Sequence, residues 1–183
     1  MKKALGVIGG VLAVAIVVVL GLAMMQPDSY AVERSKTFDA SPEAVWAQVS
    51  DFGNFSKWSP WHKHDPKMET QLSGKPGEVG HKYSWQCNDD AGSGSMTMIA
   101  IQPGQRIDID LLFVEPFEDK ATTAYVLSKE GEGKTKLTWS MRGNNNFMGK
   151  IICVFMSFEE MIGKDYDEGL TNLQKVLAPA PAP

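Results

Sequence analysis

The chain has 183 residues, of which 43% are hydrophobic and 22% are charged. Its 18 basic and 22 acidic residues give a formal net charge of −4. This acidic balance argues against nucleic acid or anionic lipid headgroups as the main partner, but it does not exclude a buried apolar ligand.

The first 27 residues are predicted to be a membrane anchor. Residues 4–25 are 22 consecutive positions without a charge, and a helix of that length measures about 33 Å, enough for the roughly 30 Å hydrocarbon core of a bilayer. Lys2 and Lys3 precede this run. The positive-inside rule therefore predicts a single pass through the inner (plasma) membrane, with the N-terminus cytoplasmic and the domain on the periplasmic or extracytoplasmic side. The alternatives are a signal peptide with a weak cleavage site at residues 21–23, or a segment that is mis-oriented or not in a membrane at all.

Residues 28–177 are long enough for one domain with its own core. Without the two lysines before the apolar run, 16 basic and 22 acidic residues remain, a formal charge of −6. Residues 178–183 read APAPAP and are predicted to be a disordered tail. Cys87 and Cys153 would be able to pair outside the cytoplasm, but two buried free thiols are the expectation.

The predicted elements of the domain begin with a strand over residues 30–38. Ser41 is a good N-cap for a short helix with Pro42 at its first position, and Asp51 is suited to cap a second short helix. Alternation with period two then predicts six strands, and the turn-like sequences between them favour an antiparallel meander. These strands span residues 67–74, 78–87, 94–102, 105–115, 118–129 and 134–143.

The C-terminal part is predicted to be helical. Residues 147–156 form a short, very apolar helix, and the pattern from Ser157 to Glu160 is a capping box that restarts it. Gly163 and Gly169 weaken the following helix by roughly 1 kcal/mol each relative to Ala, and they permit either bending of the helix or its close approach to the sheet. One apolar stripe follows this helix: Phe158, Met161, Ile162, Tyr166, Leu170, Leu173 and Leu177.

An amphipathic helix of this kind must cover one face of the sheet. The predicted fold class is therefore α+β. It consists of a curved seven-strand antiparallel sheet around a long C-terminal helix, two short helices after the first strand, and one N-terminal transmembrane helix.

Six short phrases along the domain carry a family resemblance. They are YAVERS at 30–35, ASPEAVW at 40–46, WSPW at 58–61, YSW at 83–85, GSMT at 94–97 and NNNFMG at 144–149. In this order of elements the chain resembles the helix-grip superfamily of START-like proteins. It is most similar to bacterial SRPBCC proteins of the "polyketide cyclase/dehydrase and lipid transport" type, which often carry one N-terminal apolar helix.

The resemblance implies a cavity between the sheet and the long helix that holds an apolar or amphipathic molecule, lipid-like or polyketide-like. It names neither the molecule nor a reaction, because the superfamily includes carriers, enzymes and co-chaperones. The favoured hypothesis is a membrane-anchored binding module without a cofactor. A cyclase- or hydrolase-type enzyme and an envelope protein-interaction factor of unknown partner are the alternatives.

The predicted ligand-binding set consists of aromatic and methionine side chains that share the inward face. Such side chains line cavities for apolar ligands, and Tyr and Trp add polar tips. Plain core packing is the alternative for each of them. The set is Trp58, Trp61, Tyr83, Trp85, Met96, Met98, Phe113, Tyr125, Trp139, Met141 and Phe155.

Signals for other chemistry are weaker. His62, His64 and Asp65 have the side chains of metal ligands, but no further strong ligand is evident nearby, so a solvated loop is the expectation. No phosphate-binding loop or nucleophile motif is present. If the domain is an enzyme, the candidates for acid–base chemistry are His81, Tyr83, Tyr125 and Arg106.

Overall fold

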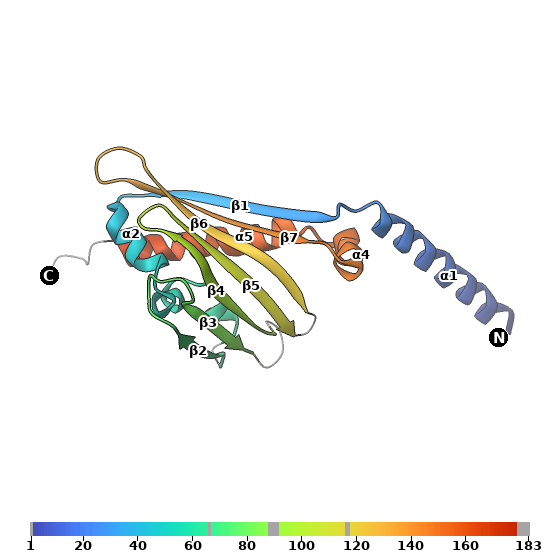
Figure 1. The fold of residues 1–183 in the computed structure, drawn as a ribbon. Helices are drawn as coiled ribbons and strands as arrows, with labels where there is room; N and C mark the ends of the chain where they lie inside the picture. Colours follow the sequence, from blue (N-terminus) through green and yellow to red (C-terminus); the bar gives the residue numbers. More distant parts are fainter. Residues whose placement is uncertain (1, 66, 88–91, 116–117, 179–183) are drawn as a thin grey trace.

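A seven-stranded antiparallel sheet is the centre of the molecule (Figure 1). The computed structural model describes residues 2–65, 67–87, 92–115 and 118–178, with the side chains of residues 2–7, 63 and 64 left aside. The spatial order of the strands is β1-β7-β6-β5-β4-β3-β2, so β1 lies beside the last strand and the other six form a meander. The strands are β1 (Ser29–Phe38), β2 (Glu69–Ser73), β3 (Lys82–Gln86), β4 (Ser93–Gln102), β5 (Arg106–Glu115), β6 (Asp119–Lys129) and β7 (Thr135–Asn144).

All seven predicted strands are present, and the fold class is confirmed as α+β with a C-terminal helix on the sheet. The largest difference is at β3, which begins at Lys82 rather than at residue 78. Gly77 and Gly80 adopt positive φ angles of 73° and 90°, and the N–H of His81 donates to the carbonyl of Glu78 at 3.1 Å. This turn occupies the residues that the alternation pattern assigns to the strand.

Capping side chains fix the short helices that follow β1. Ser41 caps α2 (Pro42–Val49), where its hydroxyl accepts a hydrogen bond from the N–H of Ala44 at 3.3 Å. Asp51 caps the 3-10 helix η1 (Phe52–Lys57) through the N–H of Gly53 at 2.7 Å. One further short helix, α3 (Trp61–His64), follows Pro60 and is missing from the prediction. A proline is tolerated at the start of a helix, because the first N–H groups of a helix have no intrahelical hydrogen-bond partner.

The long helix α5 (Phe158–Leu177) begins at the predicted cap, since the hydroxyl of Ser157 accepts from the N–H of Glu160 at 3.3 Å. It packs against β1, and Tyr166, Leu170 and Leu173 are its largest buried side chains. Met161, from the same predicted stripe, is 40% exposed.

Two glycines let α5 approach the sheet closely. A Cβ on Gly169 would lie 2.9 Å from the ring of Trp139. A Cβ on Gly163 would collide with the guanidinium of Arg34, which pairs with Glu159 at 2.8 Å and Asp167 at 3.1 Å. The predicted close approach is thus confirmed at both glycines.

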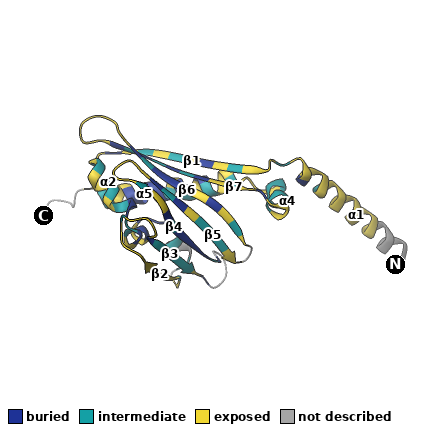
Figure 2. Cartoon of the chain, viewed as in Figure 1, coloured by how far each residue is buried: buried dark blue, intermediate teal, exposed yellow. Residues whose placement is uncertain are grey.

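Burial alternates along the central strands (Figure 2). We call the sheet face toward α5, α2 and η1 the inner face and the opposite one the outer face. α5 covers the part of the inner face near β1, while η1 contributes Phe52 and Phe55 to the same core. Short helices therefore cover much of the face that the sequence analysis assigns to α5 alone.

The N-terminal residues form the helix α1 (Lys2–Met24), which projects from the sheet (Figure 1). At its base it packs against α4 (Phe147–Phe155), a helix without a buried residue. Asn145 joins the two regions, because its backbone N–H donates to the carbonyl of Asp28 at 2.8 Å and its side-chain amide donates to that of Pro27 at 3.0 Å. Lys150 pairs with Asp28.

The predicted transmembrane helix gains no support here: within the described part of the chain, no helix is both long and apolar enough to cross a bilayer. Both cysteines are free, with Cys87 buried and Cys153 half-buried. Residues 179–183 of the predicted tail lie outside the described residues, as do 88–91 and 116–117 of two predicted turns.

Candidate functional site

The inner face has a sealed half, where side chains of β4, β5, β6 and β7 meet η1 and α5. Met98, Ile107, Ile109 and Leu137 are each 0% exposed. Trp58, which follows η1, is 1% exposed. Apolar side chains buried to this degree are packed as in a protein interior, so this half is hydrophobic core.

Aromatic rings fill the sealed half through mutual contacts. Trp58 meets Phe55 edge to face, with ring centroids 4.9 Å apart, and meets Trp139 in the same way at 5.4 Å. Trp139 stacks on Tyr166 of α5 with centroids at 3.8 Å and planes at 13°. Such aromatic pairs contribute about 0.5–1.5 kcal/mol each beyond their buried area. They hold α5 and η1 on the sheet.

A buried polar network lies beneath these rings and is centred on Thr123 of β6. Its hydroxyl donates to the carbonyl of Ser140 at 2.7 Å and accepts from the indole N–H of Trp139 at 3.1 Å. The hydroxyl of Tyr166 lies 3.4 Å from the same oxygen. Desolvation by burial raises the pKa of Tyr166. The sequence gives little signal for this network, because threonine is common in strands for its shape alone.

Several buried polar atoms have no hydrogen-bond partner among the described residues. They include the indole nitrogen of Trp58, the hydroxyl of Ser59 and the hydroxyl of Tyr125. Burial also raises the pKa of Tyr125 well above its ordinary value, which keeps the hydroxyl protonated as a donor. An unpaired buried polar group costs about 1–3 kcal/mol. The inner face thus offers polar atoms for a bound water or for the polar group of a ligand.

The other half of the inner face is open. Along β5, Ile107 and Ile109 are sealed, whereas Leu111 and Phe113 on the same face are only half-buried. Trp85 of β3 meets Phe113 edge to face, with centroids 6.0 Å apart. Gly94 makes room for this indole, since a Cβ there would lie 2.5 Å from the Trp85 ring. These half-covered apolar side chains form the open half of the inner face.

The structure divides the predicted ligand-binding residues between these regions. Tyr83, Met96, Met98, Tyr125, Trp139, Met141 and Trp58 are buried, and Trp61, Trp85 and Phe113 are half-buried. Phe155 is 70% exposed, so the prediction that it points inward is wrong. The physical reason is that α4 packs against α1 instead of the sheet. A ligand-binding role for the other residues stays a prediction.

His81 has a structural role. Its Nε2 accepts from the N–H of Phe52 at 3.0 Å, and its Nδ1 lies 3.1 Å from the carbonyl of Ser73, to which it donates. The ring also stacks on Phe52 with centroids 5.1 Å apart. With both nitrogens bonded to backbone, His81 is a satisfied core histidine and has no free nitrogen for acid–base chemistry.

The remaining candidates are Arg106 at the start of β5 and the two histidines of α3. Arg106 binds Asp108 through its side chain at 2.6 Å and is exposed. His62 is half-buried, and desolvation lowers its pKa. The side chain of His64 lies outside the described residues, and within the described part no group of three His, Cys, Asp or Glu residues is placed to hold a metal ion.

A groove of about 910 Å³ lies on the outer face. Its lining includes Thr97, Asp110, Thr122 and Arg142, which alternate along their strands with the buried inner residues. The sequence gives no signal for this groove, because strand alternation does not show where a twisted sheet becomes concave.

Comparison with known proteins identifies the family of this chain. The family described as "Polyketide cyclase / dehydrase and lipid transport" matches residues 29–178. The chain belongs to this family. No curated protein sequence matches it. The family membership indicates a module that binds a hydrophobic ligand or acts as a cyclase.

Solved structures share the fold at low sequence identity. Protein CV1439 from Chromobacterium violaceum is 16% identical with a TM-score of 0.58, and the match covers 85% of this chain and 100% of that one. Ginseng major latex-like protein 151 from Panax ginseng is 10% identical with a TM-score of 0.59, covering 83% and 99%. The Aha1 dimer from Colwellia psychrerythraea is 15% identical with a TM-score of 0.57, covering 81% and 96%. These likenesses establish the fold alone.

Proposed function

We propose that the protein binds an apolar or amphipathic small molecule, lipid-like or polyketide-like, in the open half of the inner face. The observation that carries the proposal is the change in burial along β5, from 0% exposure at Ile107 and Ile109 to half-burial at Leu111 and Phe113. Half-covered aromatic and aliphatic side chains beside a rigid core are typical of an apolar binding site.

The unpartnered polar atoms deeper in the core fit the same proposal. The hydroxyl of Tyr125 and the indole N–H of Trp58 lie on rings whose centroids are 6.0 Å apart. A ligand that carries one polar group at its inner end would satisfy one of them. The ligand class that fits best is therefore a long apolar molecule with a single polar end.

Two neighbouring residues of β5 provide a matched test. Phe113 points to the inner face and Val114, 47% exposed, points to the outer face. The full chain would be reconstituted in phosphatidylcholine nanodiscs and titrated with a fluorescent fatty acid. We expect Phe113→Asp to weaken binding about tenfold or more, because it places a charge among apolar side chains, and Val114→Asp to leave it unchanged.

Equal loss of binding in both variants would contradict an inner-face site, and so would unchanged binding in both. Mass spectrometry of an organic extract of the purified chain identifies the ligand class. Repeated absence of any extractable or exchangeable apolar molecule counts against the proposal.

We further propose that α1 attaches the protein to a membrane, with the domain on the extracytoplasmic side. Support comes from the apolar exterior of α1, where Val11, Val14 and Val17 are each at least 65% exposed, and from Lys2 and Lys3 before the apolar run. The test is a reporter that functions only in the cytoplasm, fused after Leu177. Activity of this reporter would overturn the proposed topology. Recovery of the intact chain in the soluble fraction would overturn the attachment.

A cyclase-type enzyme is the second candidate function. It is favoured by the buried hydroxyl of Tyr125, which has no hydrogen-bond partner among the described residues and whose raised pKa keeps it protonated and able to donate to a carbonyl oxygen of a substrate. Tyr125→Phe separates the two functions. An enzyme would lose turnover of its substrate while retaining the fold, whereas a carrier would change only in ligand affinity.

A further inference from the structure

One row of paired residues crosses five strands of the outer face. Lys82 pairs with Thr97, Thr97 with Asp110, Asp110 with Thr122, and Thr122 with Arg142. Directly paired residues point to the same face of a sheet. All five line the groove of about 910 Å³, which therefore has a polar, charged floor.

The cations of this groove lie on strands of one sheet face and have no ionic partner among the described residues. Lys120 is two residues before Thr122 on β6, and Arg142 lies opposite Thr122 on β7, so the two residues are diagonal neighbours whose Cα atoms are about 7–8 Å apart. Neither they nor Lys82 forms a hydrogen bond or ion pair with a described residue. Two adjacent cations that form no ion pair with a described residue create a local positive field.

The nearby carboxylates reduce this field without cancelling it, since the groove lining has three cations (Lys82, Lys120 and Arg142) and one carboxylate, Asp110. Asp110 lies across the strand from Thr122 but forms no ion pair with Lys120 or Arg142 among the described residues. Glu118 and Asp119 adjoin Lys120 along the chain and likewise form none with it. Asp108, two residues before Asp110 on β5 and on the same face, does form an ion pair, with Arg106.

The groove is also partly apolar, and one end of it lies where β1 follows α1. Ile99 is 44% exposed and Leu112 half-buried, and both contribute to its lining. Ser29 and Asn144 line the end at which β1 follows α1. An amphiphile with an anionic head thus finds cations, apolar surface and the apolar exterior of α1 in one region.

We propose that this outer groove binds the anionic headgroup of a phospholipid, with the phosphate between Lys120 and Arg142. Thr122 and Asn144 donate hydrogen bonds, and Lys82 lies at the far end of the same groove. The acidic balance of the whole chain argues against such a partner, but it averages over both faces of the sheet, whereas binding depends on the local field. The site is separate from the proposed inner-face ligand. It depends on membrane attachment only for the source of the lipid.

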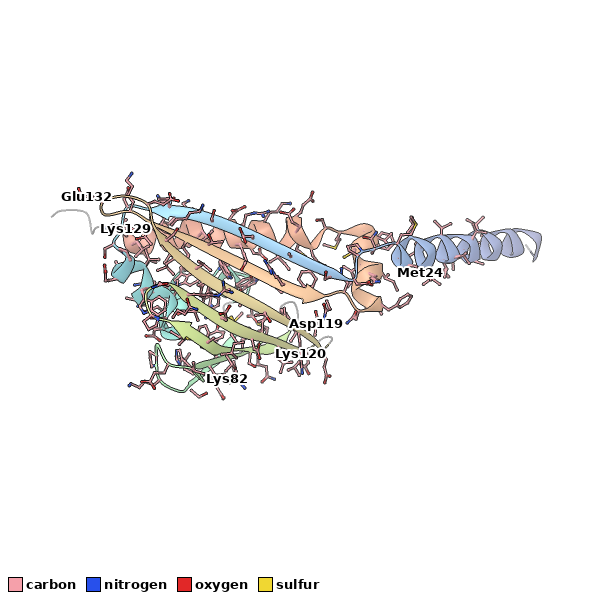
Figure 3. The ribbon with its side chains drawn as sticks, turned by 45° about the horizontal axis from the view of Figure 1, so that its top comes forward. Met24, Lys82, Asp119, Lys120, Lys129 and Glu132 are labelled. Atoms are coloured by element: carbon pink, nitrogen blue, oxygen red, sulfur yellow. The ribbon has the colours of Figure 1, made fainter. Side chains whose placement is uncertain are left out.

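Two lysines of β6 make a matched pair for a test. Lys120 and Lys129 lie at opposite ends of this strand (Figure 3), about 30 Å apart at 3.4 Å per residue. The full chain in neutral detergent micelles would be titrated with dihexanoyl phosphatidylglycerol, dihexanoyl phosphatidylcholine and inorganic phosphate. These short-chain probes report on the groove whether or not α1 enters a membrane.

The expected result is preferential binding of the anionic lipid, weakened by salt. Lys120→Gln and Arg142→Gln each weaken it about fivefold, and Lys129→Gln leaves it unchanged. Asp110→Asn strengthens it, because the variant removes a repelling charge. A merely structural role would not produce a gain in this variant.

Equal affinity for the two lipids would overturn the proposal, as would equal weakening by Lys120→Gln and Lys129→Gln. Inorganic phosphate that binds as tightly as the anionic lipid would also overturn it, because the groove would then take a free anion. Binding of the fluorescent fatty acid at the inner face stays unchanged in all these variants, so the two sites are tested independently.

Discussion

The two halves of the inner face are made of similar residues and differ in what covers them. In the sealed half, Ile109 is 0% exposed beneath a core that includes η1 and α5. In the open half, Leu111 lies two residues further along the same strand and the same face, yet it is only half-buried. The comparison shows that alternation on a strand identifies a face, while the helices on that face decide which part is core and which part is free for a ligand.

The strongest test of this difference is truncation on both sides of the boundary. We expect Ile109→Ala to lower the free energy of unfolding by about 2–5 kcal/mol, because it leaves a cavity in a sealed core. Leu111→Ala should cost about 1–2 kcal/mol, since part of its side chain is already exposed. Denaturant unfolding of the full chain measures both, and equal costs would remove the distinction between the halves.

Gly169 tests how tightly α5 closes the sealed half. Alanine favours a helix over glycine by about 1 kcal/mol, but here the added Cβ would lie 2.9 Å from the Trp139 ring. We expect Gly169→Ala to destabilise the protein by about 1–3 kcal/mol through overpacking. Gly149 of α4 is the control, because its nearest contact would be 3.4 Å away. Stabilisation by both substitutions would show that α5 packs loosely.

The polar network beneath α5 should contribute less. Thr123→Val removes the hydroxyl that accepts from the Trp139 indole at 3.1 Å, and we expect a loss of about 1 kcal/mol in thermal or denaturant unfolding. Thr122→Val, one residue away on the outer face, should change stability by less than about 0.5 kcal/mol. A loss at Thr122 as large as that at Thr123 would mean that the effect comes from the strand and not from the network.

The response of Tyr30 appears only at alkaline pH and is absent at neutral pH. Burial, together with the charge of Asp119, raises the pKa of Tyr30 from 10.0 to about 12. Between these values the unfolded chain releases the proton and the folded protein keeps it, so stability falls as pH rises from about 10 to 12. In the Tyr30→Phe variant, the free energy of unfolding should therefore fall less steeply between about pH 10 and 12 than in the wild-type protein, as measured by unfolding experiments at a series of pH values. An unchanged slope would show that the hydroxyl is solvated.

The sequence predicts the framework of the fold well because its signals are local. Ser41, Asp51 and Ser157 cap the helices that they are expected to cap, and alternation locates all seven strands. The prediction is incorrect where tertiary contacts decide. A glycine turn shortens β3, and Phe155 lies on a helix that packs against α1.

The candidate site is less predictable for the same reason. The alternation of side chains along a strand places Ile109 and Phe113 on one face, but it does not show that only Ile109 is sealed. The cation pair of Lys120 and Arg142 arises from the register of β6 against β7, which no local pattern gives. Composition even argues against an anionic partner, because it does not resolve one face of the sheet from the other.

The most direct test of the central claim is photolabelling of the full chain with a diazirine-bearing fatty acid, followed by mass spectrometry of the labelled residues. We expect labels on Trp85, Leu111 and Phe113 that an excess of unlabelled fatty acid removes, and none on Ile107 or Ile109. Labels confined to α1 and α4, or labels on Val114 in place of Phe113, would contradict a ligand site in the open half of the inner face.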